Sequence, residues 1–246
     1  MEWLYEGSTV RKTLQAAIAI QLVTLVTCYA IWVYQGCDPF MPFISDTDTN
    51  PVSGVPFTIG FSVSGLLMAL LSWQVFHLRS DWIATNSGAS RLGLLNASSA
   101  VAAFFAGVCT IWIAFTPWNE QLALHLFQAK LIFGGFVLWA ILSTVLASEM
   151  ASLDARFEEV YRPRRLRTAF VVVCASLMGL SVVQYTGASF LASASFESYL
   201  EMVEFCTDLS IPEMSRAALF EWAMVLGLIA VVETGLHEVS LLTSDE

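Results

Sequence analysis

Residues 13–34, TLQAAIAIQLVTLVTCYAIWVY, form an uninterrupted apolar segment without a charged side chain. As a helix, a segment of this length covers about 30 Å, which is the thickness of the hydrocarbon core of a membrane. Its apolar residues run continuously and do not alternate with polar ones, which argues against a barrel strand. The segment therefore predicts a membrane-spanning helix.

Five further segments of this kind follow along the chain. The six predicted spans are residues 13–34, 57–78, 92–115, 122–147, 168–192 and 217–236. Hydrophobic residues make up 57% of the 246-residue chain and charged residues only 13%, about half the charged fraction of a soluble domain. The sequence thus predicts an all-α, polytopic membrane protein with a six-transmembrane-helix bundle. Because the connections are short, residues 1–246 are expected to form a single transmembrane domain.

Lysine and arginine are distributed unevenly among the connections. They precede the first span and cluster at the second and fourth connections, as Arg11, Lys12, Arg79, Arg91, Arg156, Arg162, Arg164, Arg165 and Arg167. The positive-inside rule therefore predicts that both termini are cytoplasmic and that the odd-numbered connections face outside or a lumen. The basic fourth connection either contacts anionic headgroups or only fixes the topology. The expected location is the cell membrane, or an endomembrane if the cell is eukaryotic.

The chain carries a net charge of −10, with nine arginines and two lysines. An acidic surface with little lysine suits concentrated salt, so we interpret the protein as salt-adapted; an acidic membrane protein of an ordinary cell is the alternative. Cys37 and Cys206 both fall in outward-facing connections, where a disulfide between them would need an oxidising compartment. Sequence alone does not decide whether they pair.

Two of the outer connections have a distinct character. The first, residues 36–56, holds four of the seven prolines with clustered Asp, Thr and Ser, which predicts a loop of fixed shape. The fifth predicts a short amphipathic helix on the outer surface or over the bundle mouth. Its apolar face would hold Phe196, Tyr199, Leu200 and Val203, and its other faces Glu197, Glu201, Glu204 and Asp208. Near the outer boundary, Trp32, Trp112, Trp118 and Trp222 indicate an interfacial belt.

Ionisable residues inside the spans are candidates for function, because burying them in lipid is costly. At 1.5 Å per residue, Lys130 lies about 12 Å below the outer end of the fourth span and Glu221 about 7 Å below Arg216. The long lysine side chain bridges that difference, so we predict that Lys130 and Glu221 approach each other, with His125 nearby. A purely structural ion pair is the alternative. Glu233, near the inner end, is expected to be solvated by headgroups.

The standard catalytic and cofactor templates find little support. Of the three histidines, His77 and His237 lie near the cytoplasmic face and His125 near the outer one, so no three-histidine zinc site is expected. A triad of Ser45, Asp46 and His125 lacks any supporting motif. Lys130 could suggest a retinal Schiff base, but a chain with six spans and its lysine in the fourth does not match the pattern of seven-helix retinal proteins. The sequence predicts no metal, no cofactor and no nucleic-acid partner.

The first outer loop and the start of the sixth span together resemble a known family. Residues 42–47, PFISDT, followed by Thr49, Pro51 and a span, resemble the first loop of the Frag/DRAM/Sfk family of six-span membrane proteins. Residues 217–222, AALFEW, are similar to that family's S-A-x-x-E-W element. His125 takes the place of the family's outer histidine, whereas Asp48 stands where the family usually has glycine.

The family includes damage-regulated autophagy modulators and a GPI-anchor lipid-remodelling factor, and the resemblance implies a role in handling membrane lipid. By this resemblance Ser45, Asp46, Thr47, His125, Glu221 and Trp222 form a polar cluster at the outer mouth, where the depth argument also places Lys130. The full set of candidate ligand-binding residues is Ser45, Asp46, Thr47, His125, Gln128, Lys130, Glu221 and Trp222.

The leading hypothesis is a non-enzymatic protein that binds or organises membrane lipid at this cluster. One alternative is a lipid-modifying, acyl-remodelling enzyme with His125 as base. The other is a proton- or ion-coupled transporter in which Glu221 and Lys130 titrate. Membrane lipids are the expected partners, and membrane-protein partners or a homo-oligomer stay open.

Overall fold

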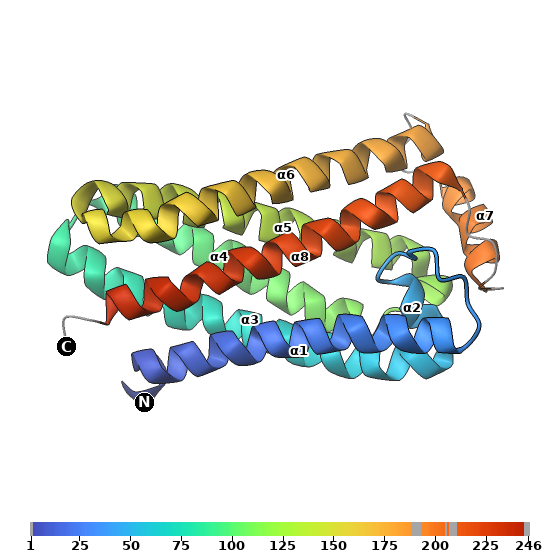
Figure 1. Ribbon diagram of the computed structural model, residues 1–246, viewed down its shortest axis with the longest axis horizontal. Coiled ribbons are helices and arrows are strands. Elements are labelled where there is room, and N and C mark those ends of the chain that lie inside the picture. Colours follow the sequence, from blue (N-terminus) through green and yellow to red (C-terminus); the bar gives the residue numbers. More distant parts are fainter. Residues whose placement is uncertain (1, 188–192, 205, 207–210, 244–246) are drawn as a thin grey trace.

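Six long apolar helices make up the body of the molecule (Figure 1). The computed structural model describes residues 2–187, 193–204, 206 and 211–243, and all regular structure in these residues is helical. The helices of membrane-spanning length are α1 (Gly7–Tyr34), α3 (Pro51–Asn86), α4 (Ser90–Ile113), α5 (Trp118–Leu153), α6 (Glu158–Thr186) and α8 (Pro212–Leu242). The predicted all-α fold with six spans is confirmed.

The short elements distinguish the two ends of the bundle. The helices α2 (Asp46–Thr49) and α7 (Ser193–Glu204) lie at one end, with the α4–α5 connection; we call this the loop end (Figure 1). Both chain termini lie at the other end, the termini end, as do the turns η1 (Glu2–Tyr5) and η2 (Ala155–Phe157). Which end faces the cytoplasm stays a prediction from the arginine distribution.

Several helices continue past their apolar segments at the termini end. α3 runs on to Asn86 and α5 to Leu153, and α6 begins at Glu158, well before the predicted start of its span. The end of the hydrocarbon region does not itself terminate a helix, so these helices continue until the chain turns. At the end of α3 the turn is made by Gly88, with φ 61°. Residues 188–192, the last part of the predicted fifth span, lie outside the described residues.

The six helices pack in the ring order α1, α3, α4, α5, α6 and α8, with α8 closing on α1. The backbones of α3 and α4 approach each other closely, since a Cβ atom on Gly65 would lie 2.5 Å from the carbonyl oxygen of Gly107. Only glycine at these positions lets the two backbones come so near. The interface between α5 and α6 is much smaller than those of α4 with α5 and α6 with α8. This loosely packed seam bears on the site described below.

The outer surface of the bundle is apolar, as a membrane requires. Large side chains such as Val26, Ile59, Leu66 and Phe105 point outward and are each at least 60% exposed. An apolar surface of this kind, on helices of this length, is stable only in lipid.

The predicted tryptophan belt is wrong for three of its four members. Trp112 is exposed, but Trp32, Trp118 and Trp222 are buried inside the loop end. The indole N–H of Trp32 donates to the Asp38 carbonyl, and that of Trp222 donates to the Pro42 carbonyl. These two side chains therefore hold the first loop and do not face the membrane surface.

The basic fourth connection is also only partly a surface feature. Arg162 and Arg165 are exposed, whereas Arg164 is buried and pairs with Glu238. Glu233 is half-exposed, as expected for a residue near the inner boundary, and it pairs with Arg167.

Candidate functional site

The first loop folds inward and closes the loop end. Besides the two tryptophan contacts, the hydroxyl of Tyr29 donates to the Pro39 carbonyl at 2.7 Å. α3 then starts with Pro51 in its first turn, and the side chain of Asn50 caps it by accepting from the Val52 amide at 2.9 Å. The fixed shape predicted for this loop is thereby explained.

The ISDT residues form a short turn in which Ile44, Asp46 and Thr47 are buried and Ser45 is partly exposed. Asp46 Oδ2 accepts the Phe43 amide at 2.8 Å, and the Thr47 hydroxyl donates to the Ile44 carbonyl at 2.6 Å. The hydroxyl of Ser53, one turn into α3, donates to the Thr47 carbonyl. Asp46 and Thr47 are both completely inaccessible to solvent. Their side chains thus shape the loop from within.

Glu221 reaches this turn from α8. Its carboxylate accepts the Ile44 amide at 2.8 Å, and the side chain is buried. Two consecutive amides, those of Phe43 and Ile44, therefore bond two different carboxylates, Asp46 and Glu221. The first loop and α8 meet at a buried acidic pair, which the sequence argument had placed at the same mouth of the bundle.

Tyr199 of α7 completes the environment of Asp46. Its hydroxyl donates to Asp46 Oδ2 at 3.1 Å, and its ring stacks on Trp118, with 5.8 Å between ring centroids. Burial raises the pKa of Asp46 to about 7, against the opposing effect of the hydrogen bonds from Phe43 and Tyr199. Burial and the nearby Asp46 raise the pKa of Tyr199, which keeps its hydroxyl a donor.

A second acidic residue of the turn, Asp48, is also buried. Burial, and to a lesser extent the charge of Glu120, raise its pKa to about 7. Asp48 occupies the position where the family that the sequence resembles usually has glycine. The loop end of this chain therefore concentrates carboxyl groups in a poorly solvated place.

His125 and Gln128 are fixed by Thr116, which lies in the α4–α5 connection. His125 Nδ1 lies 2.6 Å from the Thr116 carbonyl, which only accepts, so Nδ1 carries the proton of the neutral ring. The Thr116 hydroxyl donates to Gln128 Oε1 at 2.5 Å. His125 Nε2 and Gln128 Nε2 are buried and have no hydrogen-bond partner among the described residues. The imidazole thus keeps one unprotonated nitrogen available.

Two cavities meet at these residues. The larger, of about 400 Å³, lies between α5 and α6 under the loop end, and we call it the α5–α6 cavity. The inner cavity, of about 90 Å³, extends among α1, α3, α4, α5 and α8. Ser45, His125 and Glu221 line both cavities. The polar residues therefore stand where the two spaces join.

The α5–α6 cavity is polar only near the loop end. Farther down, its walls are Phe133, Gly134 and Val137 from α5 and Ala175, Met178, Gly179 and Val182 from α6. Lys130 and Gly134 line it and are exposed, so it reaches the surface of the bundle along the loosely packed seam.

Most of the predicted site residues lie on this cavity. Ser45, Asp46, His125, Lys130 and Glu221 line it. Lys130 and Glu221 both line it, with Lys130 at its exposed edge and the Glu221 carboxylate bonded to the first loop. That the two side chains approach each other stays a prediction. Thr47 and Trp222 are buried supports of the first loop, and Gln128 is a buried partner of Thr116.

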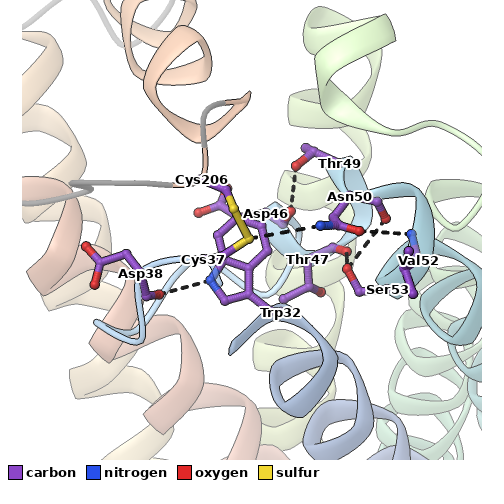
Figure 2. Close-up of a disulfide and its surroundings, with 10 residues drawn as sticks. All are labelled: Trp32, Cys37, Asp38, Asp46, Thr47, Thr49, Asn50, Val52, Ser53 and Cys206. Carbon is purple, nitrogen blue, oxygen red and sulfur yellow. Dashed lines mark hydrogen bonds between the residues drawn. A yellow bond between two sulfur atoms is a disulfide. The ribbon is translucent and has the colours of Figure 1, made fainter. Parts of the chain in front are cut away.

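A disulfide joins the first loop to the segment that follows α7 (Figure 2). Cys37 and Cys206 are bonded, which settles the question that the sequence left open. Beside the disulfide, the Asp38 amide donates to the Cys206 carbonyl at 2.8 Å. The predicted amphipathic helix is confirmed as α7, with Tyr199 and Val203 buried and Glu197 and Glu201 exposed. The side chains of Phe196 and Glu204, and the whole of Asp208, lie outside the described residues.

Sequence reasoning missed Tyr199 as a partner of Asp46 and counted it only as part of an apolar face. A tyrosine on such a face carries a hydroxyl that needs a buried acceptor, and this was the available signal. Thr116 orients His125 through its main-chain carbonyl. A main-chain contact does not depend on the residue type, so the sequence could not indicate it.

The fold and the site define a multi-pass membrane protein whose loop end encloses a buried acidic pair, a histidine and an open-sided cavity. The chain belongs to the family described as Frag1/DRAM/Sfk1/Cwh43P N-terminal domain, whose family model matches residues 14–235. It resides in the cell membrane or an endomembrane. No curated protein and no solved structure matches the chain significantly.

Proposed function

We propose that this protein binds a membrane lipid at the loop end, with the headgroup beside Ser45, His125 and Glu221 and an acyl chain between α5 and α6. The observation that carries this proposal is the α5–α6 cavity, which is polar at one end and apolar along its length. An amphiphile matches that division, because its apolar chain would be buried against apolar walls while its head keeps polar partners.

The headgroup end offers both kinds of hydrogen-bonding group. His125 Nε2 and the Glu221 carboxylate are acceptors, and the Lys130 ammonium at the cavity edge is a cation. A polar headgroup bound there would lie at the boundary of one leaflet. With the termini in the cytoplasm, this is the outer or lumenal leaflet.

A lipid-modifying enzyme is the second candidate. His125 is held by Thr116 with its other nitrogen unprotonated, as a general base requires, and Glu221 lines the same cavity. Transport is favoured less. Met68, Trp139 and Val232 line both the inner cavity and a smaller cavity near the termini end, so the boundary between these two cavities is apolar and offers no polar path for an ion.

We also propose salt adaptation as the reason for the acidic composition. Glu197 and Glu201 project from the exposed face of α7, and the chain's net charge is −10. If this is so, the protein should stay monodisperse in salt concentrations that precipitate most membrane proteins.

Native mass spectrometry of the purified protein tests the lipid proposal. Gly179 lines the cavity, and a Cβ atom there would meet nothing within 4 Å, so Gly179→Leu fills the space without a clash at its Cβ. Gly93 on α4 is equally open, exposed and remote from the cavity, so Gly93→Leu is the matched control. We expect a lipid adduct in the wild type and in Gly93→Leu, and its loss in Gly179→Leu.

Three results separate the candidates. An adduct retained in Gly179→Leu would contradict binding between α5 and α6. Consumption of the bound lipid, abolished by His125→Ala, would show an enzyme. An adduct that persists without turnover, also in His125→Ala, would support binding alone.

A further inference from the structure

A second cluster of charged residues lies inside the bundle near the termini end, far along α8 from Glu221. Glu238 Oε1 accepts from Arg79 Nε at 2.7 Å, and Oε2 accepts from Arg79 Nη2 at 2.8 Å and from Arg164 Nη2 at 2.6 Å. Arg164 Nε also donates to the Thr234 hydroxyl at 2.7 Å. All three charged side chains are at most 5% exposed. α3, α6 and α8 are therefore joined by one buried ionic network.

The charges of this network do not balance. Two guanidinium groups, which stay protonated in proteins, face one carboxylate, so the cluster carries one excess positive charge. The other buried carboxylates that the structure describes, Asp46, Asp48 and Glu221, all belong to the loop end. The neighbouring Arg167 already has Glu233 as its partner at the surface. An uncompensated charge in a dry interior is strongly unfavourable.

Polar groups beside the network lack partners and share a cavity with it. Arg79, Asn96, Ser99, Arg164 and Glu238 line a cavity of about 40 Å³. Arg164 Nη1, Ser99 Oγ and Asn96 Oδ1 are buried and have no hydrogen-bond partner among the described residues. One water needs roughly 10–15 Å³ of cavity volume, so this cavity has room for a small ion together with a water.

We propose that this cavity binds a small monovalent anion, chloride in the cell, between Arg164 and Ser99. The guanidinium Nη1 and the hydroxyl donate to the anion, and a water beside it donates to Asn96 Oδ1. The anion offsets the excess charge of the two arginines. A lipid phosphate does not fit, because Arg79 and Arg164 are only 4% and 2% exposed and the cavity is too small. This site is independent of lipid binding at the loop end.

Thermal unfolding of the full-length protein in detergent tests the proposal. Chloride or bromide is raised at constant ionic strength with gluconate as the balance, since gluconate is too large for the cavity. We expect the Tm to rise by several degrees and to saturate with either halide, as for any ligand that binds only the folded state. Ser99→Ala should raise the halide concentration that gives half of the Tm increase at least tenfold. Arg164→Lys should raise it further.

The control is Arg167→Gln, which removes a surface-paired arginine one turn from Arg164 and should leave the halide response unchanged. If Arg164→Lys does not fold, Ser99→Ala still decides the matter, because it removes only one hydroxyl. Equal Tm values in chloride and gluconate would mean that the cavity holds water only, and the proposal would be wrong. An undiminished response in Ser99→Ala would equally overturn it. In crystals grown with bromide, an anomalous peak in the cavity would place the ion directly.

Discussion

Asp46 combines two demands that normally conflict. Its carboxyl group shapes the first loop by accepting hydrogen bonds from Phe43 and Tyr199, yet it is completely buried a short distance from Glu221. Burial favours the protonated form, and hydrogen bonds to the carboxylate favour the ionised one. Oδ1 is buried and has no hydrogen-bond partner among the described residues, while Oδ2 takes both bonds, so a proton on Oδ1 disturbs neither of them.

This arrangement predicts that the protein loses stability as the pH rises. The pKa of Asp46 is about 7 in the folded protein and near the ordinary 3.8 in the unfolded chain, so the folded state binds more protons between these values. Its contribution is lost from about pH 4 to pH 7 and is on the order of 2–4 kcal/mol. Asp48 acts in the same direction. Thermal unfolding at pH 5 and pH 8 measures the effect.

Asp46→Asn should remove much of this pH dependence, because the amide keeps the acceptor oxygen and cannot ionise. At pH 8 the variant should be at least as stable as the wild type, with a residual slope from Asp48. An unchanged slope in the variant would show that Asp46 is not the group that titrates.

Among the elements, α8 connects the two polar regions. Near its start it carries Glu221 and Trp222, which hold the first loop, and near its end Thr234 and Glu238, which hold Arg164. Its hydrophobic residues between these points, such as Met224 and Val231, are buried in the central core. It is also more deeply buried than the other five spanning helices. A change at either end of α8 therefore acts on the whole bundle.

Glu238→Gln is predicted to destabilise the protein by about 3–5 kcal/mol, because it removes the buried carboxylate with which both Arg79 and Arg164 pair. Glu233→Gln breaks the neighbouring, half-exposed pair on the same helix and should cost about 0–1 kcal/mol. Chemical or thermal unfolding of the two variants side by side measures the difference. Similar losses in both would mean that burial of the network does not matter to its strength.

Removing the disulfide is also predicted to lower stability, with the effect concentrated at α7. Replacing Cys37 and Cys206 by serine removes the covalent tie between the first loop and the end of α7, at a cost of about 2–4 kcal/mol. Hydrogen exchange should rise in α7 and in residues 36–45, with little change in the middle of α3 and α8. A reductant should reproduce the effect in the wild type and add nothing in the double variant. Unaltered exchange in α7 would show that Tyr199 and its neighbours hold the helix without the bond.

Sequence alone predicted the spans well because hydropathy belongs to a segment and needs no knowledge of its neighbours. The resemblance for Asp46, and the depth argument for His125 and Glu221, also predicted that these residues lie at one end of the bundle, and there they line one cavity. That they bind a ligand stays a prediction. It could not predict how each helix is rotated about its axis. For that reason the burial of Arg79 and Arg164 was not foreseen, since the sequence shows them only as members of the basic connections. Glu238, which pairs with both arginines, was not a candidate residue, because its burial follows from helix packing and not from the local sequence.

At the scale of the whole molecule, the two ends differ in charge and construction. The loop end is closed by a folded loop, α7 and a disulfide, and its buried ionisable groups are mainly acids. The termini end carries eight of the nine arginines, both exposed and buried, and only Arg216 lies at the loop end. The positive-inside rule assigns the second end to the cytoplasm, and disulfide formation independently favours an oxidising environment for the first.

Cysteine labelling tests this orientation. Glu120 and Ser87 are exposed at the loop end and the termini end, respectively, while Cys28, Cys109 and Cys174 are buried. In sealed cells a membrane-impermeant maleimide should label Glu120→Cys, and it should label Ser87→Cys only after permeabilisation. The reverse pattern would invert the molecule in the membrane and place the lipid site in the opposite leaflet.

The position of the disulfide in the chain also bears on biogenesis. Its two cysteines are 169 residues apart, one after the first spanning helix and the other after the fifth. As the chain leaves the ribosome, Cys206 reaches its partner only when α6 has been inserted in the correct direction. A nascent chain that skips or inverts one helix delivers the second thiol to the wrong compartment. Formation of the disulfide therefore requires an even number of membrane crossings between the two cysteines, and the structure has four, namely α3, α4, α5 and α6.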